Sequence, residues 1–164
     1  MQRNKSYLKI AKKRIIILLY TMIFAKKPRI FDPKFEAVGC FVQCDGKIIL
    51  LHRQNHKPQG DTWGIPSGKI DQKENPATTM LREIKEETGI IIPKNELNSY
   101  STIYVKFRDY DFVYHIFYTT IDEKQKIKIK NDEHKDSKWI TPEDALKLPL
   151  IEDLDGCIKL FYKI

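Results

Sequence analysis

Residues 82–90, with the sequence REIKEETGI, bring Glu83, Glu86 and Glu87 within two turns of a predicted helix. Like charges one helical turn apart destabilise a helix by about 0.2–0.5 kcal/mol per pair. A divalent cation converts that repulsion into coordination, because carboxylate oxygens are the ligands that Mg²⁺ and Mn²⁺ prefer. The competing interpretation is an ordinary solvated helix face, which three glutamates alone do not exclude.

The helix that must carry these carboxylates is predicted over residues 76–88. Asn75 can cap its first turn, Pro76 suits the first helical position and Gly89 suits the residue after its end. At 100° per residue, the apolar side is expected to collect Ala77, Leu81, Ile84 and Thr88. We therefore expect this helix to bury one side and to present its three glutamates on the opposite side.

The loop before the helix adds further oxygen atoms to this candidate site. Residues 66–74, PSGKIDQKE, expose backbone carbonyls and bring Glu74 to the same end of the helix. A backbone carbonyl combined with several carboxylates is a hard-oxygen site for Mg²⁺ or Mn²⁺.

Residues 68–90, GKIDQKENPATTMLREIKEETGI, resemble the Nudix box at every specified position: Gly, five residues, Glu, seven residues, then Arg-Glu-apolar-x-Glu-Glu-x-Gly-apolar. The flanking stretches DTWGIPSG and EHKDSKWITPEDALKLPL also resemble the family, so the resemblance covers about residues 35–164. It implies an α/β fold, a Nudix-type α/β/α sandwich with a mixed β-sheet. It also implies a metal-dependent pyrophosphohydrolase that cleaves a nucleoside diphosphate-linked substrate.

The same resemblance implies a role for each candidate site residue. The metal ligands would be the Ser67 carbonyl, Glu83, Glu86, Glu87 and Glu133. Glu83 is the first choice for the catalytic base and Glu133 the second. Glu74 would pair with Arg82 and hold the loop to the helix, and Arg53 would contact a substrate phosphate. The cofactor would be Mg²⁺ or Mn²⁺. The chain departs from the pattern at Ser67, where relatives usually have Gly, which a carbonyl ligand tolerates.

The substrate is left open by the sequence. A nucleoside triphosphate or a nucleotide sugar is favoured, and the alternatives are the 5′ end of an RNA or a non-catalytic regulator that binds a nucleotide. Aromatic residues in two predicted strands could stack on a base or belong to the core: Tyr104, Phe107, Tyr110, Tyr114 and Phe117. A homodimer is also left open.

The remaining elements are predicted from alternation and turn residues. Residues 36–44 and 48–53 form strands joined by an Asp-Gly turn, and residues 99–108 and 110–121 form two more. Residues 127–130, IKIK, and 134–140, HKDSKWI, are shorter candidate strands. Short helices are expected from Thr141 or Pro142 and over residues 153–164, the last interrupted by Gly156.

The net charge of +7 belongs to the first 34 residues, which hold ten basic residues and one acidic residue, whereas the rest of the chain is slightly acidic. We therefore divide the chain into a basic and apolar arm, residues 1–34, and a hydrolase domain, residues 35–164. The apolar stretch 15–25 could be a signal peptide, a helix packed on the domain or an interfacial membrane helix, and Met22 could be the start. Cys40, Cys44 and Cys157 contain no C-x-x-C pair, which favours reduced thiols in a cytoplasmic protein.

Overall fold

An eight-stranded mixed sheet forms the centre of the computed structural model, which describes residues 21–71, 73–107 and 109–164. The strands lie in the order β1 (Thr21–Phe24), β6 (Asn98–Phe107), β7 (Asp111–Thr120), β2 (Pro33–Cys44), β3 (Lys47–Arg53) and β4 (Trp63–Gly64). Two further strands are off this path: β5 (Ser67–Lys69) pairs with β2, and β8 (His134–Ile140) pairs with β3. Only β2 and β7 pair in parallel among these described strands.

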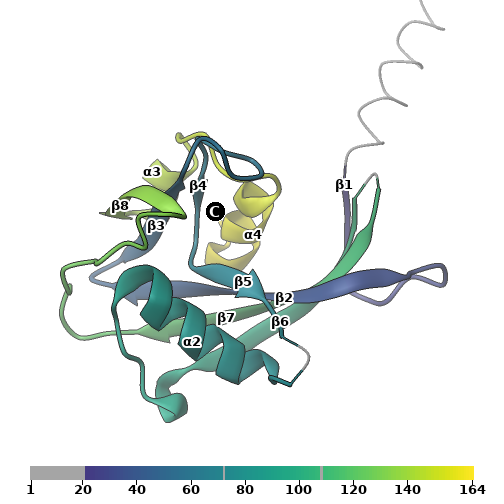
Figure 1. Cartoon of the computed structure of the whole chain (residues 1–164), viewed down its shortest axis with the longest axis horizontal. Helices are drawn as coiled ribbons and strands as arrows, with labels where there is room; N and C mark the ends of the chain where they lie inside the picture. Colours follow the sequence, from purple (N-terminus) through teal and green to yellow (C-terminus); the bar gives the residue numbers. More distant parts are fainter. Residues whose placement is uncertain (1–20, 72, 108) are drawn as a thin grey trace, which may run out of the picture.

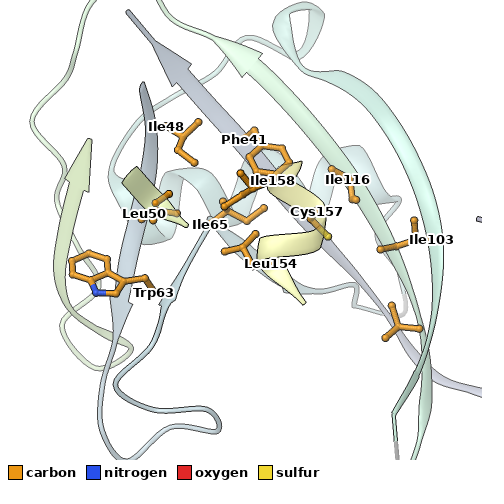
Figure 2. Close-up of a cluster of buried hydrophobic side chains, with 12 residues drawn as sticks. Phe41, Ile48, Leu50, Trp63, Ile65, Ile103, Ile116, Leu154, Cys157 and Ile158 are labelled. Atoms are coloured by element: carbon orange, nitrogen blue, oxygen red, sulfur yellow. The ribbon is translucent and has the colours of Figure 1, made fainter. Parts of the chain in front are cut away.

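Helices cover both faces of this sheet, and the two longest of the described helices, α2 (Pro76–Thr88) and α4 (Leu154–Tyr162), lie on opposite sides of β2 and β7 (Figure 1). On the α4 side, Ile158 packs with Phe41 and Ile116 (Figure 2). On the α2 side, Met80 and Ile84 pack with residues of β2 and β3. A short helix, α3 (Pro142–Ala145), and a 3-10 turn, Lys94–Glu96, complete the elements. The expected α/β/α sandwich with a mixed sheet is confirmed.

Turn and capping residues that are close in the sequence set the bounds of the elements that position the site. Asp45 and Gly46 both have positive φ values, 47° and 68°, as a two-residue turn between β2 and β3 requires. The Asn75 side chain accepts a hydrogen bond from the Thr78 N–H at 3.0 Å. Gly89 ends α2 with a φ of 74°. The predicted hairpin and the predicted bounds of α2 are confirmed.

Two expectations about secondary structure in the C-terminal half are wrong. Residues 127–130 are not a strand: Ile127 and Ile129 do pack against the core, but the Lys128 N–H donates to the Thr88 carbonyl at the end of α2 instead of to a strand. Helix α4 runs through Gly156 without a break. Alternation and a lone glycine are therefore weaker signals than the hydrogen bonds and packing that the surrounding fold supplies.

Part of the arm belongs to the sheet. Residues Thr21–Phe24 form β1, which pairs antiparallel with β6, so a helix over these four residues is wrong. Residues 15–20 of the apolar stretch lie outside the described residues. Among the described residues, we find no helix with the length and apolar character needed to span a membrane.

Replacing Gly156 with Ala should stabilise the protein, because Gly156 lies inside α4 and an added Cβ would meet no atom within 4 Å. Glycine in a helix interior costs roughly 0.5–1 kcal/mol relative to alanine, so the free energy of unfolding should rise by about that amount. Urea unfolding of both proteins measures the change. An unchanged or lower midpoint for the variant would contradict the helical assignment at this position.

Candidate active site

Glu74 and Arg82 form the ionic contact that holds the 67–74 loop on α2. The Arg82 Nη2 donates to Glu74 Oε2 at 2.9 Å, and its Nε lies 3.1 and 3.2 Å from the two Glu74 oxygens. The Thr79 hydroxyl donates to the same carboxylate at 2.9 Å. These hydrogen bonds, that of Arg82 first, hold the pKa of Glu74 below its ordinary value. The contact expected between Glu74 and Arg82 is present.

Arg82 also faces two of the predicted ligand carboxylates. Its Nη1 donates to Glu83 Oε1 at 2.7 Å and lies 3.5 Å from Glu86 Oε2. The side chains of Glu83 and Glu86 are 14% and 42% exposed. One guanidinium therefore reduces the repulsion between neighbouring carboxylates on α2.

Glu87 does not lie on the solvated side of α2, and the expectation that all three glutamates share that side is wrong. Its side chain is only 3% exposed. The predicted apolar side does face the sheet: Ile84 and Thr88 are buried, and Ala77 and Leu81 pack against the same core. The buried side is wider than expected and also includes Met80 and Glu87. The Ser67 N–H donates to Glu87 Oε2 at 2.9 Å, and His134 Nε2 lies 2.8 Å from Glu87 Oε1.

The backbone of β5 turns Ser67 toward α2. Ser67 is opposite Gly39 in the antiparallel pair of β5 and β2, and its N–H points away from β2 to Glu87. The N–H and C=O of one strand residue point to the same side, so the Ser67 carbonyl also faces α2. At the next position a side chain is excluded, because a Cβ on Gly68 would lie 2.2 Å from the Glu83 carboxyl carbon. This close approach brings Glu83 against the loop.

Glu133 comes to the same region from the segment before β8. Single ligand atoms of Glu87, Glu133 and His134 all lie within 4.8 Å of one another. Lys130 Nζ donates to Glu133 Oε1 at 2.6 Å. His134 was not among the predicted site residues. The one signal for it in the sequence is its position directly after Glu133 at the start of a predicted strand.

A cavity of about 880 Å³ lies beside these groups, between the sheet and α4. Arg53, Ser67 and Glu133 line it. The Arg53 Nε donates to the Pro58 carbonyl at 3.1 Å, which fixes the side chain in the cavity lining.

Of the five aromatic residues expected to stack on a base or to belong to the core, three line this cavity: Phe107, Tyr110 and Tyr114. Phe117 is buried in the core that faces α2, and Tyr104 packs edge-on against Phe31, which lies between β1 and β2. Core packing is therefore confirmed for Phe117, and stacking on a base stays a prediction for the three rings that line the cavity.

The NUDIX domain profile matches residues 33–161 of this sequence. The chain belongs to the Nudix family. It is 28% identical over 115 residues to the CTP pyrophosphohydrolase of Escherichia coli, covering 70% of this chain and 82% of that protein. It is 36% identical over 109 residues to the ADP-ribose pyrophosphatase of Bacillus subtilis, covering 63% of this chain and 56% of that protein.

Solved Nudix structures have the same fold. The NUDIX domain of Shewanella oneidensis NrtR, complexed with ADP ribose, superposes with a TM-score of 0.69 at 24% identity, covering 84% of this chain and 92% of that one. The enzyme class expected from the sequence, a Nudix hydrolase of phosphoanhydride bonds, is thus confirmed at the level of the family.

The Nudix carboxylates of this chain fit a divalent cation of the hard type. The candidate donors Ser67, Glu83, Glu86, Glu87 and Glu133 are all oxygen donors, which Mg²⁺ and Mn²⁺ prefer. Two of these donors have defined positions. Glu87 is held by a hydrogen bond at each oxygen, and Glu83 lies close against Gly68, which has no side chain. His134 adds a nitrogen to the cluster, although it lies at hydrogen-bonding distance from Glu87.

The two candidate bases have opposite electrostatic environments. Burial raises the pKa of Glu83, and the nearby Glu87 charge raises it further, while Arg82 acts in the other direction. The hydrogen bond from Lys130 lowers the pKa of Glu133. The choice of base stays a prediction with Glu83 first and Glu133 second, because a cation bound at Glu83 would itself lower the pKa of that carboxyl group.

The variants Arg82→Ala and Glu83→Gln should distinguish a residue that holds the loop on α2 from a residue that takes part in the reaction. Arg82→Ala removes charged hydrogen bonds worth about 1.5–3 kcal/mol each, so amide exchange over residues 66–74 should accelerate roughly tenfold or more, and activity should fall. In Glu83→Gln the amide oxygen can still accept from Arg82, so exchange should stay near wild type while turnover falls by about 10²–10⁴. Amide hydrogen exchange over residues 66–74 and the turnover number are measured for both variants and for wild type. If Glu83→Gln loosens the loop equally or keeps most activity, Glu83 is not the base.

Proposed function

We propose that this Nudix hydrolase is a divalent-metal-dependent pyrophosphohydrolase whose substrate is a small nucleoside diphosphate derivative, of the nucleoside triphosphate or nucleotide-sugar type. The observation that carries the proposal is a single cavity lined both by residues of the carboxylate site, Ser67 and Glu133, and by a group of aromatic rings. The relatives named for CTP and ADP-ribose act on substrates of this chemical kind.

The aromatic rings offer a surface on which a nucleobase can stack. Phe35 and Phe112 are 5.2 Å apart with their planes 14° apart, and Phe107 and Tyr110 are 5.2 Å apart at 16°. Lys69 Nζ lies 4.2 Å from the centre of the Phe35 ring. Base–aromatic stacking contributes roughly 1–3 kcal/mol per base. This aromatic surface favours a substrate that contains a nucleobase rather than an inorganic polyphosphate.

The spacing of the two regions also supports a nucleotide. Along β2 the cavity lining includes Phe35 and Ala37, and Gly39 beyond them pairs with Ser67. Four residues of extended chain span about 13 Å, so the aromatic surface and the Ser67 carbonyl are separated by roughly that length. A nucleotide with its base on the aromatic rings would extend its phosphates toward the carboxylates.

The residues of the chain would then divide the reaction as follows. Arg53 would bind a phosphate, and Glu83 would accept a proton from the attacking water, with Glu133 as the alternative. Ser67, Glu83, Glu86, Glu87 and Glu133 would hold Mg²⁺ or Mn²⁺. When bound, the cation neutralises phosphate charge and lowers the pKa of water. Glu74 and Arg82 would keep the loop in register with α2.

The proposal extends to the organisation and location of the chain. Residues 35–164 would carry all of the proposed metal-binding and catalytic residues, and residues 1–34 would form an arm that takes no part in the chemical step, although Ile23 and Lys34 line the cavity. A cytoplasmic location is supported by the three cysteines, Cys40, Cys44 and Cys157, which are all buried free thiols.

Glu86→Gln should abolish most metal-dependent hydrolysis with little effect on stability, since this side chain is 42% exposed. Loss of one ligand should reduce turnover by at least about a hundredfold at limiting Mg²⁺. Glu87→Gln should show the same loss but should also destabilise the fold by about 1–3 kcal/mol, because a buried amide cannot accept at both oxygen positions.

Wild type and both variants are assayed with CTP, ADP-ribose and a 5′-triphosphorylated RNA, with released phosphate and nucleoside monophosphate as readouts. Lys85→Gln, a neighbouring exposed helix residue, is the matched control. Full activity of both variants at limiting metal contradicts the metal assignment. Hydrolysis of the RNA alone contradicts the small-molecule substrate, and binding without hydrolysis of any of the three favours a regulator.

Removing residues 1–21 should leave hydrolysis of a small nucleotide nearly unchanged, because none of the proposed site residues lies there. A deletion of residues 1–25 is the informative comparison. It removes all of β1 and with it Ile23, which lines the cavity, so it should raise KM more than it changes kcat. A large loss of activity in the shorter deletion, with the protein still folded, would make the arm part of the site or of a dimer.

A further inference from the structure

We propose that His134 is a positioning residue, which fixes the Glu87 carboxylate for cation binding without itself becoming a ligand. This inference rests on the proposed metal dependence and assigns a role to a residue that lies outside the Nudix box. It concerns the buried pair formed by Glu87 of α2 and His134 of β8.

The pair is almost completely withdrawn from solvent. The side chains of His134 and Glu87 are 4% and 3% exposed, and His134 Nε2 lies 2.8 Å from Glu87 Oε1. An ionised carboxylate at such a depth is costly unless donors satisfy it. Here two donors do so: the His134 ring on one oxygen and the Ser67 N–H, at 2.9 Å, on the other.

The second ring nitrogen of His134 indicates which tautomer is present. Its Nδ1 is buried and has no hydrogen-bond partner among the described residues. A proton on Nδ1 would leave a buried donor unsatisfied, whereas a bare Nδ1 leaves only a weaker unsatisfied acceptor. An ionised carboxylate can only accept, so the proton of this contact lies on Nε2, and the ring donates it to Glu87.

This donation leaves Glu87 able to bind a cation in only one orientation. Each carboxylate oxygen has two lone pairs, and each Glu87 oxygen uses one of them on a fixed donor. The carboxylate plane is therefore pinned from two elements, β5 and β8, while one lone pair of each oxygen stays free. The ligand atoms of Glu87 and Glu133 lie within 4.8 Å, close to the roughly 4 Å between opposite ligands of one Mg²⁺.

The geometry favours positioning over direct ligation. A ligand nitrogen must direct its lone pair at the metal, but Nε2 directs its N–H at Glu87. The lone pair of Nδ1 lies on the far side of the ring, so it points away from a cation that Glu87 binds. Outer residues that hydrogen-bond a ligand typically change metal affinity by about 10–100-fold when they are removed. The hydrogen bond predicts an effect of that size, transmitted entirely through Glu87.

The test measures Mn²⁺ binding to the full-length protein by electron paramagnetic resonance, without substrate or turnover. His134→Phe keeps a planar ring but removes the donor, and it should weaken Mn²⁺ binding about 10–100-fold. His134→Gln restores an N–H donor and should recover to within about fivefold of wild type. His134→Met, which fills irregular space without a donor, replaces the Phe variant if thermal unfolding shows that Phe disturbs the fold.

Two controls separate positioning from general damage. His115→Phe removes another histidine–glutamate contact, to Glu36 at 2.7 Å on β2, and should leave Mn²⁺ affinity unchanged. In a Glu87→Gln background, His134→Phe should weaken Mn²⁺ binding no further, because its effect passes through the carboxylate already removed.

The outcomes distinguish this inference from the proposed function. If wild type binds Mn²⁺ and the His134→Phe variant binds it with equal affinity, the positioning role is overturned but the metal dependence is not. The positioning role is also overturned if His134→Phe lowers Mn²⁺ affinity as much in the Glu87→Gln background as in wild type. A nitrogen coupling from His134 in the pulsed spectrum of bound Mn²⁺ would make His134 a ligand and overturns the role as well. Wild type that binds no Mn²⁺ overturns the metal dependence and this inference with it.

Discussion

The burial of the Glu87 carboxylate is the constraint on which the arrangement of the site depends. An ionised group with 3% of its side chain exposed must be satisfied by fixed donors. Its donors come from β5, through the Ser67 N–H, and from β8, through the His134 ring. One side chain of α2 thereby fixes the distance of the helix from two strands that belong to different parts of the sheet.

The sheet provides the space for this contact because β2 changes its partner along its length. Near its end β2 pairs with β3 at Gln43 and Cys44, whereas residues 37–39 pair with β5 instead. The loop that follows β5 therefore leaves the sheet beside α2, where Arg82 holds Glu74 at 2.9 Å. On the opposite face the same part of β2 lines the cavity with Ala37, so the carboxylates and the cavity meet at one strand.

Sequence alone predicted the parts of this arrangement that depend on near neighbours. The Asn75 cap, the Asp45–Gly46 turn and the pairing of Glu74 with Arg82 join residues at most eight positions apart, and each follows from local geometry or from the Nudix pattern. The Glu87–His134 contact joins residues 47 positions apart. Its presence depends on how far the buried side of α2 extends, and the apolar pattern predicted too narrow a side because a glutamate occupies a buried position.

The strand β1 and the segment 127–130 show that a side-chain pattern can also predict the wrong secondary structure. An apolar stretch with basic flanks suggested a helix, yet residues 21–24 pair with β6 because that strand has a free edge. The alternating IKIK segment suggested a strand, yet its Lys128 N–H bonds to the last turn of α2. In both cases the backbone hydrogen bonds available at that place, rather than the side-chain pattern, decided the structure.

The carboxylates of α2 are stabilised by the protein itself in three different ways. Glu86 is 42% exposed and lies 3.5 Å from Arg82, Glu83 accepts from Arg82, and Glu87 accepts from two donors in the interior. Because each negative charge already has solvent or a donor, the fold does not require a cation to hold α2 against β5, in contrast to small domains that fold only around their metal. A cation that binds here then adds stability only by mass action, and its affinity reports how well these donors have oriented the carboxylates beforehand.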